Sequence, residues 1–397
     1  MTTMSATTHR SWKQKFGIVV LSVCVAALCA LFALSRPQHD FIEYWSAAHL
    51  LSTRANPYSL SEMSKLQDAL GWTEPVPLMF VCPPWVLPLI APLGLTSSYS
   101  FAWLVWMTSL VLVLAIGSRL LMDLYFQDLR IPEVSDTWFH RSLFVFTFFP
   151  VLLCLKYAQL APFLLLGLAG FLFFMRRNRT VLAGSFLALT AIKPQLLFLV
   201  WIAVLLESVR RRRWVVLFSA FAVIGVLTGI ALVLDRSAFQ QYRDLIRTPY
   251  LAINPSGATA VIRHSLKGRD TYWIQFIPPF VGITWLGIYW RRRRASWDWL
   301  AEMPMLVTMS VLTSAYGWVF DQTVLGLAVI AVAAGSARPK AQIPWDLIVW
   351  YSGLNCALIL LSDVPQLTYL PVPVMLLFFL RRRMTQESKF ATSAGIA

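Results

Sequence analysis

Long apolar runs, separated by compact clusters of arginine, restrict what this chain can fold into. A helix needs about 20 residues to cross the roughly 30 Å of hydrocarbon in a bilayer. Apolar runs recur from residues 16–34 to residues 369–380, and only 13% of all residues are charged, against roughly 25% in soluble domains. The sequence therefore predicts an all-α polytopic membrane protein and excludes an ordinary soluble enzyme.

The basic residues gather in short clusters beside these runs. The chain has 34 Lys and Arg against 19 Asp and Glu, a net charge of +15, and 17 of the 34 lie in five clusters. The clusters are Arg10/Lys13/Lys15, Arg176/Arg177/Arg179, Arg210 to Arg213, Arg291 to Arg294 and Arg381 to Arg383. Lys and Arg concentrate in the cytoplasmic loops of membrane proteins. The charge therefore indicates membrane orientation and not nucleic-acid binding.

Thirteen apolar segments can be counted along the chain. They are residues 16–34, 78–95, 99–121, 141–155, 159–175, 181–191, 194–206, 214–234, 273–290, 303–313, 320–335, 343–361 and 369–380. The first and last basic clusters should both be cytoplasmic, which requires an even number of crossings. The segment at 78–95 contains four prolines, which remove backbone hydrogen-bond donors, so we expect it to be broken or re-entrant.

These considerations predict about 12 crossings of the plasma (inner) membrane, with both termini in the cytoplasm. Residues 1–383 form a single transmembrane domain, and residues 384–397 form a disordered cytoplasmic tail. The domain's outer loops are residues 35–77 and 235–271.

The segment at 181–206 has the length of one span but carries arginine clusters at both ends. A hairpin of two short helices, turning at residues 191–194, places both clusters on one side of the membrane. It also places Lys193 near the outer face. The alternative is a single span with one arginine cluster outside.

Two carboxylates lie at the start of the first outer loop. If residues 40–45 are helical, Asp40 and Glu43 share one face a turn apart, with Tyr44 beside them. A carboxylate that neighbouring aromatic rings partly desolvate can act as a general base. The alternative is a pair of solvated loop charges beside aromatic residues that mark the interface.

Several short motifs, in this order and spacing, resemble glycosyltransferase family 87 over roughly residues 35–330. They are Asp40-Phe41 with Tyr44-Trp45, Asn56-Pro57-Tyr58, Cys82-Pro83-Pro84, Ala91-Pro92-Leu93, Tyr157-Ala158-Gln159, Ala191-Ile192-Lys193-Pro194, Asn254-Pro255-Ser256 with Arg263, and Ser314 to Asp321. The chain departs from the family in three places. Ala158 replaces the usual glycine, Pro255 intrudes into an Asn-x-Ser motif, and Cys82 replaces an aromatic residue.

The resemblance implies a GT-C-like membrane fold and an inverting transfer of a sugar, mannose in many members, from a polyprenyl phosphate to an acceptor hydroxyl on the outer face. It implies that Asp40 is the general base. Lys193, Arg263 and Gln159 are the candidates for the donor phosphate. Candidates for substrate binding are Glu43, Tyr44, Trp45, Asn254, Ser256, Tyr316, Trp318 and Asp321.

For several of these residues, an ordinary structural role is the alternative to a functional one. Lys193 would also suit a snorkelling lysine at the interface. Arg263 has His264, Lys267 and Arg269 as neighbours, which is typical of a generic basic loop. Tyr316 and Trp318 would also suit an aromatic belt.

The sequence predicts no cofactor and no metal. The five cysteines have no paired spacing, no His/Cys/Asp group has ligand spacing, and no phosphate-binding or dinucleotide fingerprint occurs. The partners we expect are the lipid-linked donor, a glycolipid or glycan acceptor and the bilayer, without nucleic acid. The alternative functions are a secondary transporter or lipid-linked-sugar flippase, and an enzyme of this fold that transfers a pentose.

Overall fold

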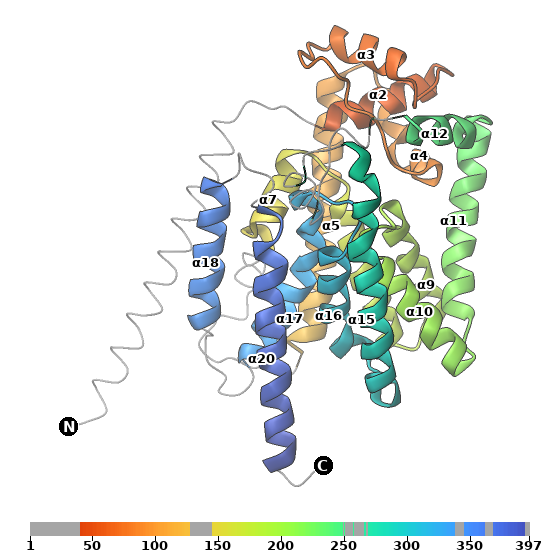
Figure 1. The fold of residues 1–397 in the computed structure, drawn as a ribbon. Coiled ribbons are helices and arrows are strands. Elements are labelled where there is room, and N and C mark those ends of the chain that lie inside the picture. The colour runs from red at the N-terminus through yellow and green to blue at the C-terminus, as the bar shows by residue number, and fades with distance from the viewer. Residues whose placement is uncertain are drawn as a thin grey trace.

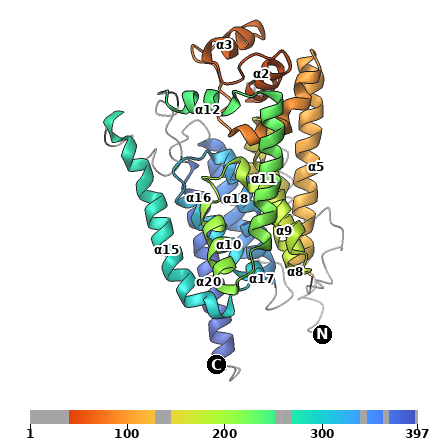
Figure 2. The ribbon, with the colours of Figure 1, turned by 90° about the vertical axis from the view of Figure 1, so that its right-hand side faces the viewer.

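The computed structural model describes residues 40–127, 145–248, 250, 257, 266, 269–337, 345–361 and 368–393. Within these ranges the chain forms helices and turns and no strand, which confirms the all-α prediction. The longer helices lie alongside one another, and three short helices gather at one end of the bundle (Figures 1 and 2). These are α2 (Phe41–Ser52), α3 (Leu60–Ala69) and α12 (Ala238–Ile246).

Among the described residues, two helices are long and apolar enough to cross a membrane: α5 (Tyr99–Tyr125) and α11 (Val215–Leu234). Helix α5 begins where the Ser98 side chain accepts a hydrogen bond from the Phe101 backbone N–H. Large apolar side chains on α11 are exposed, Phe218 to 68% and Phe221 to 58%. An apolar surface of this kind suits contact with lipid chains and not with water.

Shorter apolar helices make up most of the remaining bundle. They are Pro84–Leu95, Ala161–Arg176, Thr180–Ile192, Trp299–Leu312, Val319–Gly335 and Leu347–Leu360. Spans of this length cross only with local thinning of the bilayer or in combination with a second segment. The expected span at residues 16–34 lies outside the described residues, and the number of about 12 crossings stays a prediction.

The proline-rich segment at 78–95 is broken, as predicted. It consists of η1 (Pro84–Val86), α4 (Leu87–Ile90) and η2 (Ala91–Leu95). Pro83 has an extended backbone with ψ 153°, and the regular structure begins only after it. The η2 turn packs closely against α2, so this broken element supports the helix that follows Asp40.

Residues 180–211 form the predicted hairpin. The first arm is α9 (Thr180–Leu187) continued by η3 (Ala188–Ile192), and the second arm is α10 (Phe198–Arg211). Thr180 and Arg211, at the ends of the two arms far from the turn, line one cavity. Lys193, at the turn, lines a different cavity. The chain therefore reverses at Lys193 and returns both arginine clusters to the same end of the bundle.

The remaining elements complete the bundle. They are α7 (Phe149–Lys156), α8 (Ala161–Arg176), η4 (Arg269–Phe276), α15 (Ile277–Arg293), η5 (Arg294–Ser296), α16 (Trp299–Leu312), η6 (Val319–Leu325), α17 (Gly326–Ala337), α18 (Trp345–Leu360) and α20 (Pro371–Ser393). At the end opposite to α2, the Tyr125 hydroxyl donates to the Leu300 carbonyl over 2.8 Å. Nearby contacts join α20 to α17, where Arg383 Nη1 donates to the Ala331 carbonyl over 3.1 Å.

Helix α20 extends past the boundary that the sequence analysis expected. A disordered tail was predicted from residue 384, but the helix continues to Ser393. Residues 384–393 contain neither glycine nor proline, and half of them are good helix formers. Residues 394–397 lie outside the described part of the chain.

Candidate functional site

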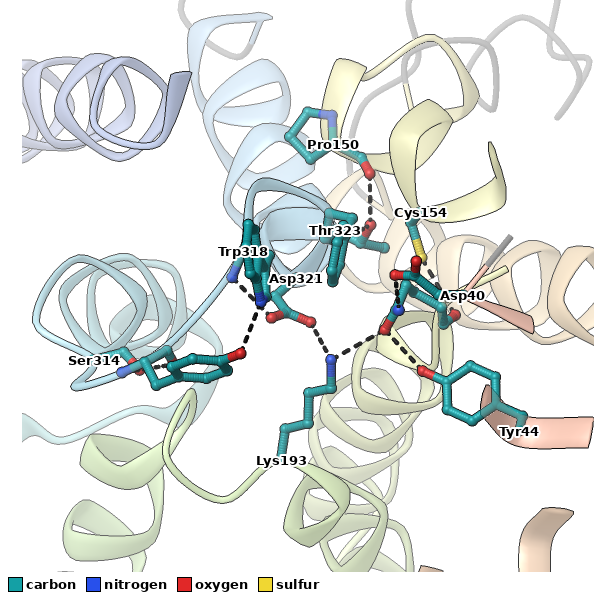
Figure 3. A network of polar contacts seen from close by, with 12 residues as sticks. Asp40, Tyr44, Pro150, Cys154, Lys193, Ser314, Trp318, Asp321 and Thr323 are labelled. Carbon is teal, nitrogen blue, oxygen red and sulfur yellow. Dashed lines mark hydrogen bonds and ion pairs between the residues drawn. The ribbon is translucent and has the colours of Figure 1, made fainter. Parts of the chain in front are cut away.

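A cavity of about 610 Å³ lies at the end of the bundle that carries α2. Its walls come from α2, the proline-rich segment, the junction of α7 and α8, the hairpin turn and the loop before η6. The predicted site residues that line it are Asp40, Glu43, Tyr44, Gln159, Lys193, Tyr316 and Trp318. Segments separated by more than 270 residues in sequence therefore meet at one place (Figure 3).

Gln159 connects the two charged parts of this cavity. Its amide nitrogen Nε2 donates to Asp40 Oδ2 over 2.5 Å. Its oxygen Oε1 accepts from the Tyr44 hydroxyl over 2.8 Å and from Lys193 Nζ over 3.2 Å. The side chain is 3% exposed, and these three bonds fix which end of the amide faces the carboxylate.

Lys193 and Asp321 form an ion pair on the other side of Gln159. Lys193 Nζ lies 2.7 Å from Asp321 Oδ1, and the Asp321 side chain is 2% exposed. The second oxygen of Asp321 accepts from the Trp318 backbone N–H over 3.0 Å. An ionisable side chain in an apolar hairpin is costly without a partner, and the carboxylate of Asp321 is that partner.

The turn between α7 and α8 presents Gln159 to the cavity. Ala158 is in the left-handed region with φ +54°, and the Gln159 N–H donates to the Cys154 carbonyl over 2.9 Å. This is the hydrogen-bonding pattern of a helix C-terminus, where glycine is favoured. Trp106 Nε1 also donates to the Ala158 carbonyl over 2.8 Å. A glycine at position 158 would adopt this backbone conformation without the steric cost that alanine meets.

Aromatic packing places Asp40 at the cavity. Asp40 immediately precedes α2. The rings of Phe41 and Tyr44 on α2 are buried and lie against Tyr99 and Trp106 of α5, with centroids 5.2 and 5.7 Å apart. These contacts orient the first turn of α2 so that both carboxylates line the cavity.

Burial raises the pKa of Asp40 from 3.8 to about 6. The hydrogen bond from Gln159 and the charge of Lys193 lower the pKa, and the charge of Asp321 raises it, but the loss of solvation outweighs them. A carboxylate with a pKa near 6 is ionised at neutral pH and more basic than an ordinary aspartate. Asp40 therefore has the properties of a general base.

Glu43 is the second carboxyl group that lines this cavity. Burial raises its pKa well above the usual value, and the neighbouring charge of Asp40 raises it further. Two carboxylates that share one cavity do not both ionise readily. Glu43 therefore has a higher affinity for a proton than an ordinary glutamate, and its carboxyl group lies in the same cavity as Asp40.

The remaining predicted residues fall into three groups. Tyr316 and Trp318 lie next to each other in the wall, where Trp318 Nε1 donates to the Tyr316 hydroxyl over 3.0 Å. Trp45 is not in the cavity lining; it stacks on His49 and contacts Tyr99 edge-on. The predicted substrate- and phosphate-binding residues Asn254, Ser256 and Arg263 lie outside the described residues.

The structure adds cavity residues that the sequence analysis did not identify. Lys156, at the end of α7, brings a second ammonium group to the lining. Tyr242 and Tyr250 also line the cavity, and the Tyr250 hydroxyl accepts from the Met79 backbone N–H over 3.1 Å. Lys156 could have been found, since it is an ionisable residue that ends an apolar run. The tyrosines have no comparable local signal.

The described cavity suits a polar ligand that carries negative charge and hydroxyl groups. Lys156 and Lys193 supply positive charge, and Asp40 and Glu43 supply carboxyl groups for hydrogen bonds. Apolar side chains such as Leu78 and Leu153 form other parts of the wall. Among the described residues, no group of three or more His, Cys, Asp or Glu could hold a metal ion.

A comparison with protein families matches the central part of the chain, which includes part of this cavity. Residues 80–315, more than half of the chain, match the model of glycosyltransferase family 87. The matched region includes Gln159 and Lys193 and begins after Asp40. No curated protein and no solved structure matches the chain.

Proposed function

The chain belongs to glycosyltransferase family 87, and from this premise we propose that it transfers a hexose, mannose, from a polyprenyl-phosphate donor to an acceptor hydroxyl on the outer face of the membrane. One observation carries the proposal: Asp40 lies in a cavity that also contains Lys193, and Gln159 bonds to both. A base and a cation in one cavity are what such a displacement requires.

The reaction is a single displacement at the anomeric carbon. Asp40 removes the proton from the acceptor hydroxyl as its oxygen attacks the sugar. The bond from the anomeric carbon to the phosphate oxygen breaks, its electron pair leaves with the phosphate, and the anomeric configuration inverts. The proton remains on Asp40, and the polyprenyl phosphate departs as an anion.

The cations stabilise the leaving phosphate. Lys193 has three N–H donors, of which two reach Asp321 and Gln159, so one remains for a phosphate oxygen. Lys156 lines the same cavity. Charge-assisted bonds to phosphate oxygens are short and strong, and they strengthen as charge develops on the leaving group.

The apolar part of the wall supports a lipid-linked donor. Leu78, Met79, Val81, Phe149 and Leu153 line the cavity beside its charged groups. An isoprenoid chain gains free energy by contact with such a surface. Glu43, Tyr316 and Trp318 then bind the sugar through hydrogen bonds and ring contacts.

The test is product formation by the purified protein in detergent. The protein is incubated with labelled polyprenyl-phosphate mannose and an extract of acceptor lipids, and products are identified by mass spectrometry. We expect mannosyl products that Asp40→Asn reduces by about 10²- to 10⁴-fold, the usual contribution of a general base. Asp68→Asn is the control, because it removes an exposed carboxylate of α3 with the same change in charge.

Other outcomes would reject parts of the proposal. Equal turnover by Asp40→Asn and wild-type protein would exclude Asp40 as the base. Product formed from a nucleotide sugar but not from the lipid-linked sugar would exclude the donor. A flippase makes no product in detergent, because it needs a sealed membrane, so absence of product with donor movement in vesicles would exclude the transferase.

A further inference from the structure

A second cavity, of about 460 Å³, lies at the opposite, arginine-rich end of the bundle. Its walls come from α8, α9, α10, α11 and the start of α16, and it shares no lining residue with the first cavity. It brings together two of the basic clusters, which contribute Arg176, Arg211 and Arg213. The proposed sugar transfer uses none of these residues.

The two carboxylates of this cavity already have partners. Glu207 is 4% exposed; its Oε1 accepts from Arg210 and from Trp290 Nε1, and its Oε2 accepts from Arg210 and Arg211, all within 2.9 Å. Asp298 caps α16, where its Oδ2 accepts from the Ala301 N–H over 2.9 Å. These bonds satisfy the acidic groups of the cavity within the protein.

Several donors of the cavity have no such partner. The side chains of Arg176 and Arg213 make no hydrogen bond or ion pair with the residues that the structure describes. Helix α9 begins at Thr180 without a side-chain cap, which leaves its first N–H groups to another acceptor. Such an excess of donors favours an anion.

Apolar side chains form the rest of the wall. Phe171, Leu172 and Met175 of α8 lie there with Val204 and Val216. Val216 belongs to α11, whose next turns expose Phe218 and Phe221. The cavity therefore adjoins an apolar outer surface, and its arginines lie at the ends of apolar helices, where phospholipid headgroups would be.

We propose that this cavity binds the phosphate headgroup of an anionic phospholipid. Arg176, Arg213 and the start of α9 contact the phosphate, and the α8 and α11 side chains contact the acyl chains. Basic pockets between membrane helices bind anionic headgroups in this way. A free phosphate would use the same donors but would leave the apolar wall without a partner.

The test measures lipid binding by the purified full-length protein in detergent, using native mass spectrometry. Dioleoyl-phosphatidylglycerol and dioleoyl-phosphatidylcholine, which differ only in the headgroup, are added at equal concentrations. We expect wild-type protein to retain phosphatidylglycerol in preference, and the double variant Arg176→Gln/Arg213→Gln to bind it about tenfold more weakly or worse.

The matched control is Arg291→Gln/Arg292→Gln, which removes the same two charges from exposed positions on α15 outside the cavity. We expect it to change binding by less than about twofold, since general surface attraction is weak and screened. If the first double variant fails to fold, Arg213→Gln is compared with Arg292→Gln, because both residues are exposed.

Three results would overturn the inference. The control could weaken binding as much as the cavity variant, which would indicate general surface charge. The cavity variant could bind phosphatidylglycerol as tightly as wild type. Millimolar inorganic phosphate or ADP could displace the lipid completely, which would indicate a site for a soluble anion. None of these results depends on whether sugar transfer occurs.

Discussion

At the scale of the residue, the pKa of Asp40 makes a direct prediction about pH dependence. The base must be ionised to accept a proton, and burial holds its pKa at about 6. We therefore expect kcat/KM to be constant above about pH 7 and to fall tenfold for each pH unit below about 6. Initial rates between pH 5 and pH 8 measure this profile. A rate that stays constant down to pH 5 would contradict the assignment.

A substitution of Gln159 should change the pH dependence of kcat/KM. The side-chain N–H of Gln159 donates to the Asp40 carboxylate and lowers the pKa of that group. In Gln159→Leu this bond is lost, so the pKa of Asp40 rises and the acidic limb moves to higher pH, by about 1 unit. Tyr44→Phe is the comparison, because its hydroxyl bonds to Gln159 and not to Asp40. Equal shifts in both variants would show that Gln159 has no specific effect on the base.

Ala158 carries a backbone conformation that suits glycine better. Its φ is +54°, and in this left-handed region the alanine Cβ lies too close to the following carbonyl oxygen. Ala158→Gly should raise the free energy of unfolding by about 0.5–1 kcal/mol, after the larger chain entropy of glycine is subtracted. Thermal unfolding in detergent measures the change. Ala169→Gly, in the buried middle of α8, should have the opposite sign, and a destabilised Ala158→Gly would refute this account.

At the scale of the element, Gly94 controls how the proline-rich segment supports α2. A Cβ at Gly94 would overlap the Ala48 carbonyl, so Gly94→Ala must push η2 and α2 apart. Because α2 follows Asp40, we expect lower thermal stability and a fall of at least about tenfold in sugar transfer. Gly225→Ala on α11 is the control, since nothing lies within 4 Å of a Cβ there. Full activity in Gly94→Ala would show that this contact does not position the base.

The helices and turns could largely be predicted from local sequence, but the contacts between residues far apart in the sequence could not. Apolar runs, prolines and paired arginine clusters were sufficient to predict the broken segment at 78–95 and the hairpin at 180–211. Asp40, Gln159 and Lys193 were identified one by one from short motifs. The bond between Asp40 and Gln159 joins residues 119 positions apart, and the partner of Lys193 is 128 positions away. Such pairings depend on helix packing, which no local pattern specifies.

Trp45 was predicted to bind substrate from the same motif, but it does not line the cavity. It lies beside Tyr44 in the sequence, but the two side chains leave α2 at different angles. Tyr44 reaches the cavity, whereas Trp45 stacks on His49 with ring centroids 4.9 Å apart. Its indole N–H is buried and has no hydrogen-bond partner in the part of the chain that the structure describes. Adjacency in sequence therefore does not place both rings at the substrate, because neighbours on a helix point in different directions.

At the scale of the whole molecule, the two ends of the bundle differ in charge. Helices α2, α3 and α12 lie at one end of the bundle (Figure 2). The proposed catalytic cavity lies at this end, and the second cavity, with its arginines, lies at the opposite end. Arg383 reaches α17 near that same end. The arginine clusters on α8, α10, α15 and α20 thus lie toward the same end of the bundle.

This asymmetry predicts which end faces the cytoplasm. Positive residues remain on the cytoplasmic side during insertion, so the arginine-rich end should face inward and α3 should face outward. Single cysteines at Glu74 and at Arg292, both exposed positions, are treated with a membrane-impermeant maleimide in intact cells. We expect Glu74→Cys to react more than the parent chain, and Arg292→Cys to do so only after permeabilisation. The reverse pattern would place the Asp40 cavity on the cytoplasmic face, where soluble nucleotide sugars are present, and the case for a lipid-linked donor would lose its basis.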